Sequence, residues 1–314
     1  MSCRLAALLA LALSMSGCSS QPGAAPPQEV RLAVGSRGGD FWSFGIELER
    51  VVQARNRHYK LTIIRAIGRQ TLQAVQDGTA ECGFAFSNLA YEAYSGKLDV
   101  PGNRHDRLRG VASIEVTPLN LLVPTASPIQ SIRDLRGRRA IIGTPDSGSF
   151  RAAGLVLDAY RLSGGAVEML AEGFNRVRAY LQDGRADAVL ILARPPFGFS
   201  NDGLRPVPID DEVVDTLRQR YPFFRAVLVP SGGFQGYPTP LKTVGIESVL
   251  LCRDLLAPDL VRQLAADWFV ALDRLLKAGE LPQAFTRKAA SATPIPLHQG
   301  ARDYYRARQV LLQD

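Results

Sequence analysis

Residues 30–64 read VRLAVGSRGGDFWSFGIELERVVQARNRHYKLTII and predict the fold. Strand-like apolar residues at Val30–Val34 lead into a glycine-rich turn, an amphipathic stretch from Phe41 to Arg55, and a second apolar run at Leu61–Ile64. A strand, a helix and a strand in this order form a βαβ unit, from which parallel sheets are built. We therefore expect an α/β protein.

The alternation of strands and helices continues beyond this unit and restarts near residue 131. Apolar, strand-like runs follow near residues 82–86 and 108–123. The segment SIRDLRGRRAIIG at 131–143 then begins a second series of short strands and helices. Because 314 residues exceed the usual size of a domain with one core, we expect two lobes.

A return of the chain to the first lobe is predicted from VGIESVLLC at 244–252, a strand-like run. We therefore expect residues 29–123 together with 244–314 to form lobe 1, and residues 124–243 to form lobe 2. The segment after the returning strand has the clearest helical periodicity, with apolar residues at Val261, Leu264, Ala265, Trp268, Leu272 and Leu275. Since these positions share one helix face, that face is expected in the core.

The N-terminal segment MSCRLAALLALALSMSGC, residues 1–18, predicts export. One charge precedes an apolar run that has about half the length of a membrane span, and small residues stand before Cys18. We expect a signal peptide over residues 1–17, acylation of Cys18, a linker over 18–28, and a body held by lipid at the periplasmic or extracellular face of the cell envelope. A plain secretory signal is the alternative, because Met15 stands where bacterial lipoboxes usually carry Leu.

Charge and cysteine content narrow the class of protein further. The formal net charge is +7, but the arginines are scattered and no nucleic-acid-binding motif occurs, so nucleic acid is not an expected partner. A mild positive field favours small anionic ligands or an anionic membrane surface. Cys82 and Cys252 lie in apolar runs, which fits either two buried thiols or one disulfide. His58, His105 and His298 stand far apart, and we expect neither a metal nor another cofactor.

Three turns rich in glycine and serine each fall between a strand and a helix. They read GSRGGDFW (35–42), FSNLAYEAY (86–94) and TPDSGSF (144–150). Loops at this end of the strands converge in open α/β sheets, and the N–H groups of helix N-termini attract anions. Two turns belong to the first lobe and one to the second, so we expect a ligand cleft between the lobes.

Seven blocks of sequence together resemble the TAXI class of extracytoplasmic solute receptors, which serve tripartite ATP-independent periplasmic (TRAP) transporters. In the order of that family they read AVGSRGGDFW, FSNLAYEAYSG, IRDLRGRRAIIGTPDSGS, LQDGRADAVLIL, YPFF, GGFQGYPTPLKTVGIESVLL and TPIPLHQGARDYY. The resemblance implies a two-lobed, type II periplasmic-binding-protein-like fold with two crossing strands as the hinge. It also implies a small, usually carboxylate-bearing solute in the cleft and a TRAP-type permease as partner.

The same resemblance implies the ligand-binding residues. By their match to family motifs these are Gly38, Gly39, Phe41, Trp42, Ser87, Asn88, Tyr91, Ser147, Gly148, Ser149 and Phe234. Asn88 replaces an Asp of the family, which is consistent with a more acidic ligand. The sequence departs from the family pattern at two arginines, which we add to the expected ligand-binding residues. They are Arg69, in AIGRQ where the family usually has small residues, and Arg194, in ARPPFG where a small apolar residue is frequent. Each arginine is either a solvent-facing charge or a fork for a ligand carboxylate.

We therefore expect a solute-binding lipoprotein, not an enzyme, that captures a small organic anion, either an amino acid or a carboxylate, for a TRAP-type transporter. One alternative is a ligand-binding module of an envelope or sensory complex without a transporter. Ser19 keeps this alternative open, because a residue other than Asp after the lipidated cysteine usually allows transfer to the outer membrane in Gram-negative bacteria. A second alternative is an enzyme on the same scaffold, with Asp40 or Asp146 as acid or base.

Overall fold

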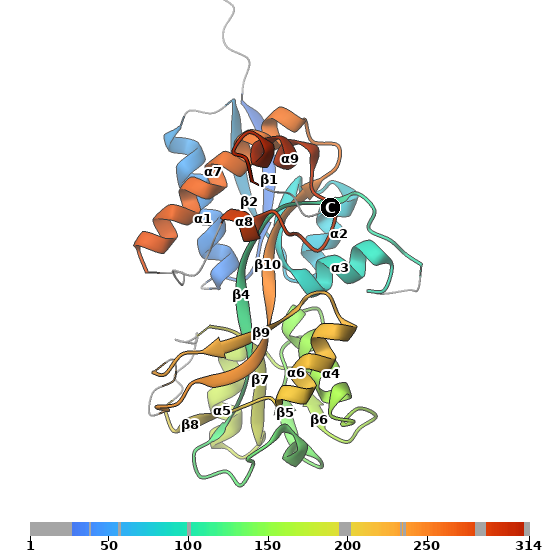
Figure 1. Cartoon of the computed structure of the whole chain (residues 1–314), viewed down its shortest axis with the longest axis vertical. Coiled ribbons are helices and arrows are strands. Elements are labelled where there is room, and N and C mark those ends of the chain that lie inside the picture. Colours follow the sequence, from blue (N-terminus) through green and yellow to red (C-terminus); the bar gives the residue numbers. More distant parts are fainter. Residues whose placement is uncertain are drawn as a thin grey trace, which may run out of the picture.

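The computed structural model describes residues 27–37, 39–55, 58–98, 102–194, 202–232, 234, 237–279 and 287–310. Two lobes are joined by two long antiparallel strands, β4 (Leu108–Pro124) and β10 (Leu241–Arg253), which pass side by side from one lobe into the other (Figure 1). This is the α/β, two-lobed, type II periplasmic-binding-protein-like fold that the sequence predicted.

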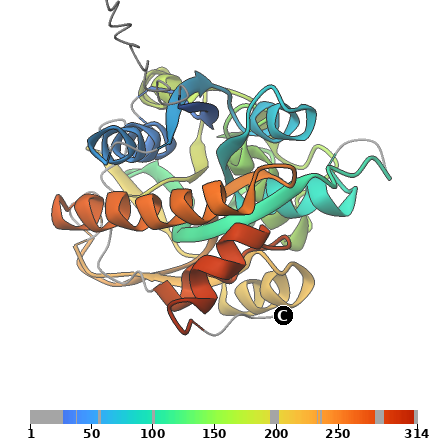
Figure 2. The same ribbon diagram turned by 90° about the horizontal axis from the view of Figure 1, so that it is seen from above.

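Lobe 1 is a sheet in the order β2-β1-β3-β10-β4, covered by helices on both faces. β1 is parallel to β2 and β3, and α1 connects β1 to β2, so the predicted βαβ unit is confirmed. Figure 2 shows α7 and α9 side by side on this lobe. The remaining elements of lobe 1 are β1 (Gln28–Val34), α1 (Asp40–Ala54), β2 (Tyr59–Arg65), α2 (Arg69–Asp77), β3 (Cys82–Phe86), α3 (Ser87–Ser95), α7 (Pro258–Lys277), α8 (Arg287–Ala290) and α9 (Gln299–Arg306).

Lobe 2 is built around β7, which is antiparallel to β4 and parallel to β5. β6 continues this sheet beyond β5, while β8 pairs with β4 and β9 pairs with β10. The elements are η1 (Ile132–Leu135), β5 (Arg139–Ile141), α4 (Gly148–Ala159), β6 (Glu168–Leu170), η2 (Phe174–Arg176), α5 (Val177–Gln182), β7 (Ala188–Leu192), β8 (Leu204–Val207), α6 (Asp211–Arg220) and β9 (Phe224–Val229).

The crossing between the lobes occurs within β4 and β10. β4 already pairs with β7 from Leu119, and β10 pairs with β9 as far as Ile246. The chain therefore crosses a few residues before the expected boundary at 123/124, and a few residues after the expected boundary at 243/244.

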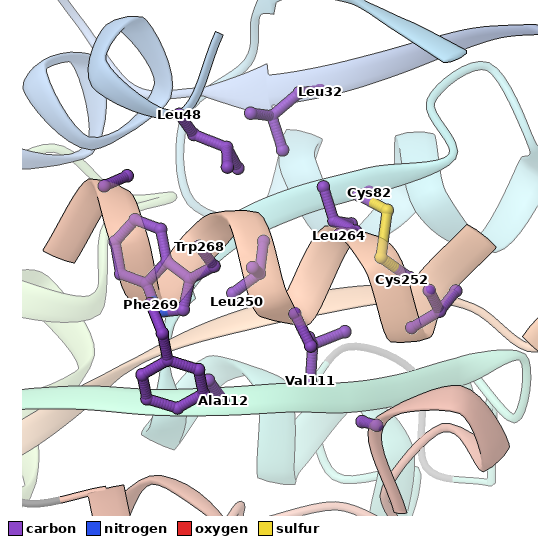
Figure 3. Close-up of a cluster of buried hydrophobic side chains, with 14 of the residues drawn as sticks. Leu32, Leu48, Cys82, Val111, Ala112, Leu250, Cys252, Leu264, Trp268 and Phe269 are labelled. Carbon is purple, nitrogen blue, oxygen red and sulfur yellow. A yellow bond between two sulfur atoms is a disulfide. The ribbon is translucent and has the colours of Figure 1, made fainter. Parts of the chain in front are cut away.

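The core of lobe 1 forms where α7 packs on the sheet. All six residues of the predicted apolar stripe of α7 are buried, and the Trp268 ring lies 5.2 Å from the ring of Phe84 on β3. Figure 3 shows Leu250 of β10 between Trp268 and Leu264 of α7, with Leu48 of α1 above them. Burying each such large side chain contributes about 1.5–3 kcal/mol, so the periodic stripe accounts for the placement of α7.

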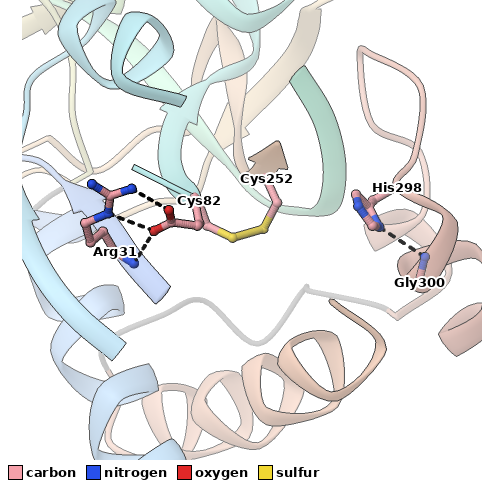
Figure 4. The surroundings of a disulfide bond; sticks show 6 residues. Arg31, Cys82, Cys252, His298 and Gly300 are labelled. Carbon is pink, nitrogen blue, oxygen red and sulfur yellow. Dashed lines mark hydrogen bonds and ion pairs between the residues drawn. A yellow bond between two sulfur atoms is a disulfide. The ribbon is translucent and has the colours of Figure 1, made fainter. Parts of the chain in front are cut away.

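A disulfide joins Cys82 of β3 to Cys252 of β10 (Figures 3 and 4). The two residues are direct partners in the antiparallel register, with their Cα atoms 4.0 Å apart. Of the two states considered for these cysteines, the structure has the bonded one. Beside the bond, Arg31 pairs with Glu81, the residue before Cys82, and the His298 ring caps α9 by accepting a hydrogen bond from the Gly300 N–H at 3.1 Å (Figure 4).

No helix within the described part of the chain combines the length and the apolar character that a membrane span requires.

Candidate functional site

The turns that begin α1, α3 and α4 meet in the middle of the molecule, where β4 and β10 pass between the lobes. Two hydrogen bonds join the lobes there, from Asn88 Nδ2 to Gly148 O at 2.9 Å and from Arg69 N to Asp146 O at 3.1 Å. Ion pairs of Arg151 and Arg194 of lobe 2 with lobe 1 carboxylates add to them. We call the residues of these contacts the interlobe zone, which comprises Asp40, Arg69, Asn88, Glu92, Glu115, Asp146, Gly148, Arg151 and Arg194.

Asn88 and Gly148 form the closest contact of the zone. Asn88 is fully buried at the start of α3, and its Oδ1 accepts a hydrogen bond from the Leu89 N–H at 2.8 Å. A Cβ atom on Gly148 would lie 2.7 Å from the Phe86 ring and 3.1 Å from Asn88 Oδ1, so a side chain does not fit there. The amide at position 88 is thus needed as a donor to a backbone carbonyl, a role that an aspartate could not fill.

The serines of the lobe 2 turn are engaged within their own lobe. Ser147 caps α4, since its Oγ accepts from the Phe150 N–H at 3.1 Å and donates to Thr144 O at 2.7 Å. Ser149 is buried, and its Oγ accepts from the Leu192 N–H on β7 at 3.0 Å. These bonds shape the turn, and the bond to Ser147 satisfies the Phe150 N–H, one of the first-turn groups that lack intrahelical partners. The Gly148 and Ser149 N–H groups of this turn are the ones suited to an anion.

Aromatic residues at the start of α1 line the lobe 1 side of this region. The Phe41 ring lies 5.0 Å from the Phe86 ring and 6.2 Å from the Phe84 ring, and so connects the interlobe zone with the lobe 1 core. Trp42 is half-buried, with the Arg37 guanidinium 5.2 Å from its ring centre. Gly39 is the residue that precedes α1.

The other predicted site residues are more dispersed. Ser87 is fully buried, and its hydroxyl has no hydrogen-bond partner among the described residues. The Tyr91 ring packs 5.8 Å from Phe223 of lobe 2. Phe234 is only 3% exposed and packs in an apolar cluster of lobe 2, so the structure does not bring it to the other predicted residues. Gly38 and the predicted lipidation site Cys18 lie outside the described residues.

Arg69 reaches across the zone to Asp146, whose Oδ1 lies 4.0 Å from Arg69 Nε. The backbone before it is equally close to lobe 2. Gly68 has a φ of +55°, and a Cβ there would lie 1.9 Å from Asp146 O, so both the conformation and the space require glycine.

Arg194 connects lobe 2 to two carboxylates. Its Nη2 lies 3.1 Å from Asp40 Oδ1 at the start of α1, and its Nε lies 3.0 Å from Glu115 Oε2 on β4. The Arg194 side chain is 18% exposed and therefore does not simply face solvent. Asp40 and Asp146, the two carboxylates considered as catalytic groups, are thus each paired with an arginine.

Glu115 is a functional candidate that the sequence analysis missed. Its side chain is 4% exposed, and neither carboxylate oxygen accepts a hydrogen bond from a described residue. Burial raises the pKa of Glu115 to about 7, Arg194 opposes this rise, and the charge of Asp40 adds to it. The available signal was a single glutamate inside the otherwise uncharged strand VASIEVTPLNLLVP.

Further polar side chains are buried on the crossing strands. Thr117 and Asn120 of β4 and Ser248 of β10 are almost fully buried, and each has a side-chain oxygen without a hydrogen-bond partner in the described part of the chain. Buried polar atoms usually find partners, so such a group beside an interlobe ion-pair cluster suggests a place for a ligand.

A second lobe contact lies between α3 and α4. Arg151 Nε donates to both oxygens of the buried Glu92, at 3.0 and 2.8 Å. By contrast, a depression of about 290 Å³ lies on lobe 2 beside Ser127, Arg138 and Leu181, at the end of β4 far from the interlobe zone. The charged contacts between the lobes therefore mark the better candidate site.

The sequence profile of the NMT1-like family matches residues 32–307. The chain belongs to the NMT1-like family. The match covers both crossing strands and nearly all of both lobes of this NMT1-like protein.

Several solved structures are similar to this NMT1-like protein over most of its length. The alkanesulfonate-binding protein SsuA from Xanthomonas axonopodis pv. citri is 18% identical, over 92% of this chain and 96% of that chain, with a TM-score of 0.48. A TctC solute binding protein from Polaromonas is 15% identical, over 90% and 89%, with a TM-score of 0.49. The periplasmic aliphatic sulphonate binding protein SsuA from Escherichia coli is 17% identical, over 90% and 89%, with a TM-score of 0.46.

Proposed function

We propose that this NMT1-like protein is an extracytoplasmic solute receptor that closes its two lobes over a small molecule. The single observation that carries the proposal is the interlobe zone itself, where helix-start turns from both lobes meet beside two crossing strands. Asn88 lies buried against Gly148 there, and the mostly buried Arg194 pairs with the buried Glu115, as expected of a closed binding protein.

Opening and closing would occur by bending of β4 and β10. Their pairing is irregular between Glu247 and Val249, next to the crossing point. A break in the regular ladder is a place where two strands can change direction with few lost hydrogen bonds. On opening, the Asn88–Gly148 and Arg194–Asp40 contacts would separate and admit the solute; on closing they would exclude water from it.

The finer proposal is that the solute carries a carboxylate, as an amino acid or another small organic anion, and is passed to a TRAP-type permease. The resemblance to TAXI receptors, the net charge of +7 and the helix-start turns support it. Catalysis is not part of the proposal, because Asp40 and Asp146 are held in ion pairs.

A lipid anchor at Cys18 belongs to the same proposal. Cys18→Ala should move the protein from the membrane fraction to the soluble fraction of its host. A variant that stays membrane-bound in high salt would show that another feature holds the protein at the membrane.

Ligand screening tests the receptor function. Protein freed of bound solute by unfolding and refolding is heated with a library of amino acids, carboxylates, sulfonates and sugars. A true solute at 100 times its dissociation constant adds about 2.7 kcal/mol to the free energy of unfolding. It should also reduce the radius of gyration measured by X-ray scattering. If no member of the library raises the melting temperature, the receptor proposal is wrong.

A further inference from the structure

Glu115 is an unusual group to find at the crossing of the two lobes. It is a buried carboxylate on a strand. Its Oε2 lies 3.0 Å from Arg194 Nε in an ion pair, but neither oxygen accepts a hydrogen bond of good geometry from a described residue. Carboxylates in proteins are rarely buried without hydrogen bonds, because removing the charge from water has a high free-energy cost. Such a group in a binding protein points to a donor that arrives with the ligand.

The neighbouring buried hydroxyls lack donors as well. Thr117 lies opposite Ile246 in the β4–β10 register, so both side chains point to the same face of the sheet. Ser248, two residues further along β10, shares that face. The ladder is irregular there: between the Glu247–Val116 and Val249–Ser113 pairs, Ser248 faces the two β4 residues Ile114 and Glu115. The Thr117 and Ser248 hydroxyl oxygens and the two Glu115 oxygens all lack a hydrogen-bond partner in the described part of the chain.

The charges at this place do not favour a simple anion. The charged groups that face Glu115 in the described residues are Arg194, which follows β7, and Asp40, which begins α1. Two carboxylates share one guanidinium, and with both ionised the group carries one net negative charge. A carboxylate arriving alone would increase this excess, whereas a cation would remove it.

We propose that Glu115 binds a protonated amine of the solute, and that the Thr117 and Ser248 hydroxyls accept its remaining N–H groups. The solute of this receptor is therefore an ammonium-bearing molecule such as a zwitterionic amino acid, and a simple carboxylic acid does not fulfil the requirement. This inference rests on the receptor function proposed above and narrows its ligand class.

Proton release is a second consequence of this arrangement. Burial raises the pKa of Glu115 to about 7 where Arg194 and Asp40 lie beside it. An ammonium group favours the ionised carboxylate. A carboxyl group that is partly protonated before binding should then release part of a proton when the solute binds near neutral pH.

Matched pairs of compounds test the inference. Titration calorimetry on solute-free protein compares each common L-amino acid with the acid that lacks its α-amino group, for example glutamate with glutarate and alanine with propionate. For the side chain that the receptor accepts, the amino acid should bind at least about tenfold more tightly than its partner. Glu115→Gln should remove most of this preference. Glu92→Gln is the control. Both oxygens of this buried interlobe carboxylate already accept hydrogen bonds from Arg151, whereas neither oxygen of Glu115 accepts one from a described residue, so Glu92→Gln should change the affinity for both compounds alike.

The possible failures are distinguishable. If the acid without the amine binds as tightly as the amino acid, or if the solute found by screening lacks an amine, the inference is wrong and the receptor function stands. Retention of the full preference in Glu115→Gln would also overturn it. If that variant does not fold, Thr117→Val combined with Ser248→Ala decides the matter, since retention of the full preference without the two hydroxyls contradicts the proposed site. Absence of binding by any solute class refutes the receptor function itself.

Discussion

Asn88 joins the two lobes through a single side-chain amide. Its Nδ2 donates to Gly148 O, and no other side chain of similar shape could both donate there and accept from the Leu89 N–H. Family resemblance identified the position, but it suggested an effect on ligand charge. The contact found in the structure indicates a role in lobe closure.

Replacement of Asn88 by Asp tests this role. The carboxylate oxygen would face the Gly148 carbonyl without a proton to donate, and a buried hydrogen bond lost in this way costs about 1–3 kcal/mol. Since the loss applies to the closed form, we expect the solute to bind about five- to 150-fold more weakly, as measured by calorimetry. Circular dichroism should be unchanged. An Asp variant that binds as tightly as the parent would contradict the role assigned to the amide.

The raised pKa of Glu115 predicts that the free energy of unfolding depends on pH. Its pKa is raised from the ordinary 4.5 to about 7 by burial, so the folded state holds a proton that the unfolded state has lost. Its contribution to stability is complete below pH 4.5 and is lost as the pH rises through 7. The measured quantity is the difference in free energy of unfolding between the parent and Glu115→Gln. This difference should decrease by about 3 kcal/mol from pH 4 to pH 8. Urea titrations of both proteins measure this difference, and a flat difference would show that Glu115 is ionised when folded.

At the scale of elements, the disulfide joins two strands that lie 170 residues apart in the sequence. It links β3, which ends at the α3 turn, to β10, which crosses to lobe 2. A bond over such a separation restricts the unfolded chain strongly. Its presence also fits an oxidising compartment, in agreement with the predicted export.

The double substitution Cys82→Ser with Cys252→Ser should therefore reduce the free energy of unfolding by about 2–5 kcal/mol. A reducing agent should lower the urea midpoint of the parent by a similar amount. The double variant itself provides the control, because it should not respond to the reducing agent. If reduction leaves the midpoint of the parent unchanged, the bond does not contribute to stability.

At the scale of the whole molecule, closure depends on charges that pair between the lobes. Arg151→Met would leave the buried Glu92 without its partner in the closed form. Because Arg151 is partly exposed, we expect a cost of about 1–2 kcal/mol rather than that of a fully buried pair. With solute bound, the variant should be more open than the parent, with a larger radius of gyration in X-ray scattering.

Two further variants complete this experiment. Addition of Glu92→Met to Arg151→Met should restore the closed form, since no unpaired charge remains. Arg133→Met removes an ion pair with Asp210 that lies within lobe 2, and should leave the scattering unchanged. Equal scattering by Arg151→Met and by the parent would mean that this pair does not hold the lobes together.

Local periodicity was sufficient to predict much of the fold. The βαβ unit of residues 30–64, the apolar stripe with Trp268 and the second series of strands all depend on neighbours within one or two turns of a helix or strand. These features follow from local patterns of apolar side chains, because apolar side chains are buried away from water when the chain folds. The sequence by itself therefore determined the α/β class and the two lobes, and the glycine and serine turns indicated where the lobes meet.

Tertiary structure alone decided how the site is connected. Asn88 and Gly148 are 60 residues apart, and Cys82 and Cys252 are 170 apart, so no local pattern predicts either contact. The same holds for Arg194. The sequence allowed either a solvent-facing or a buried arginine, and only the three-dimensional structure shows that it pairs with Asp40 and Glu115 beside the crossing of β4 and β10. Burial also decided the chemistry of Glu115, because its raised pKa comes from loss of water at the crossing and not from the residues beside it in the chain.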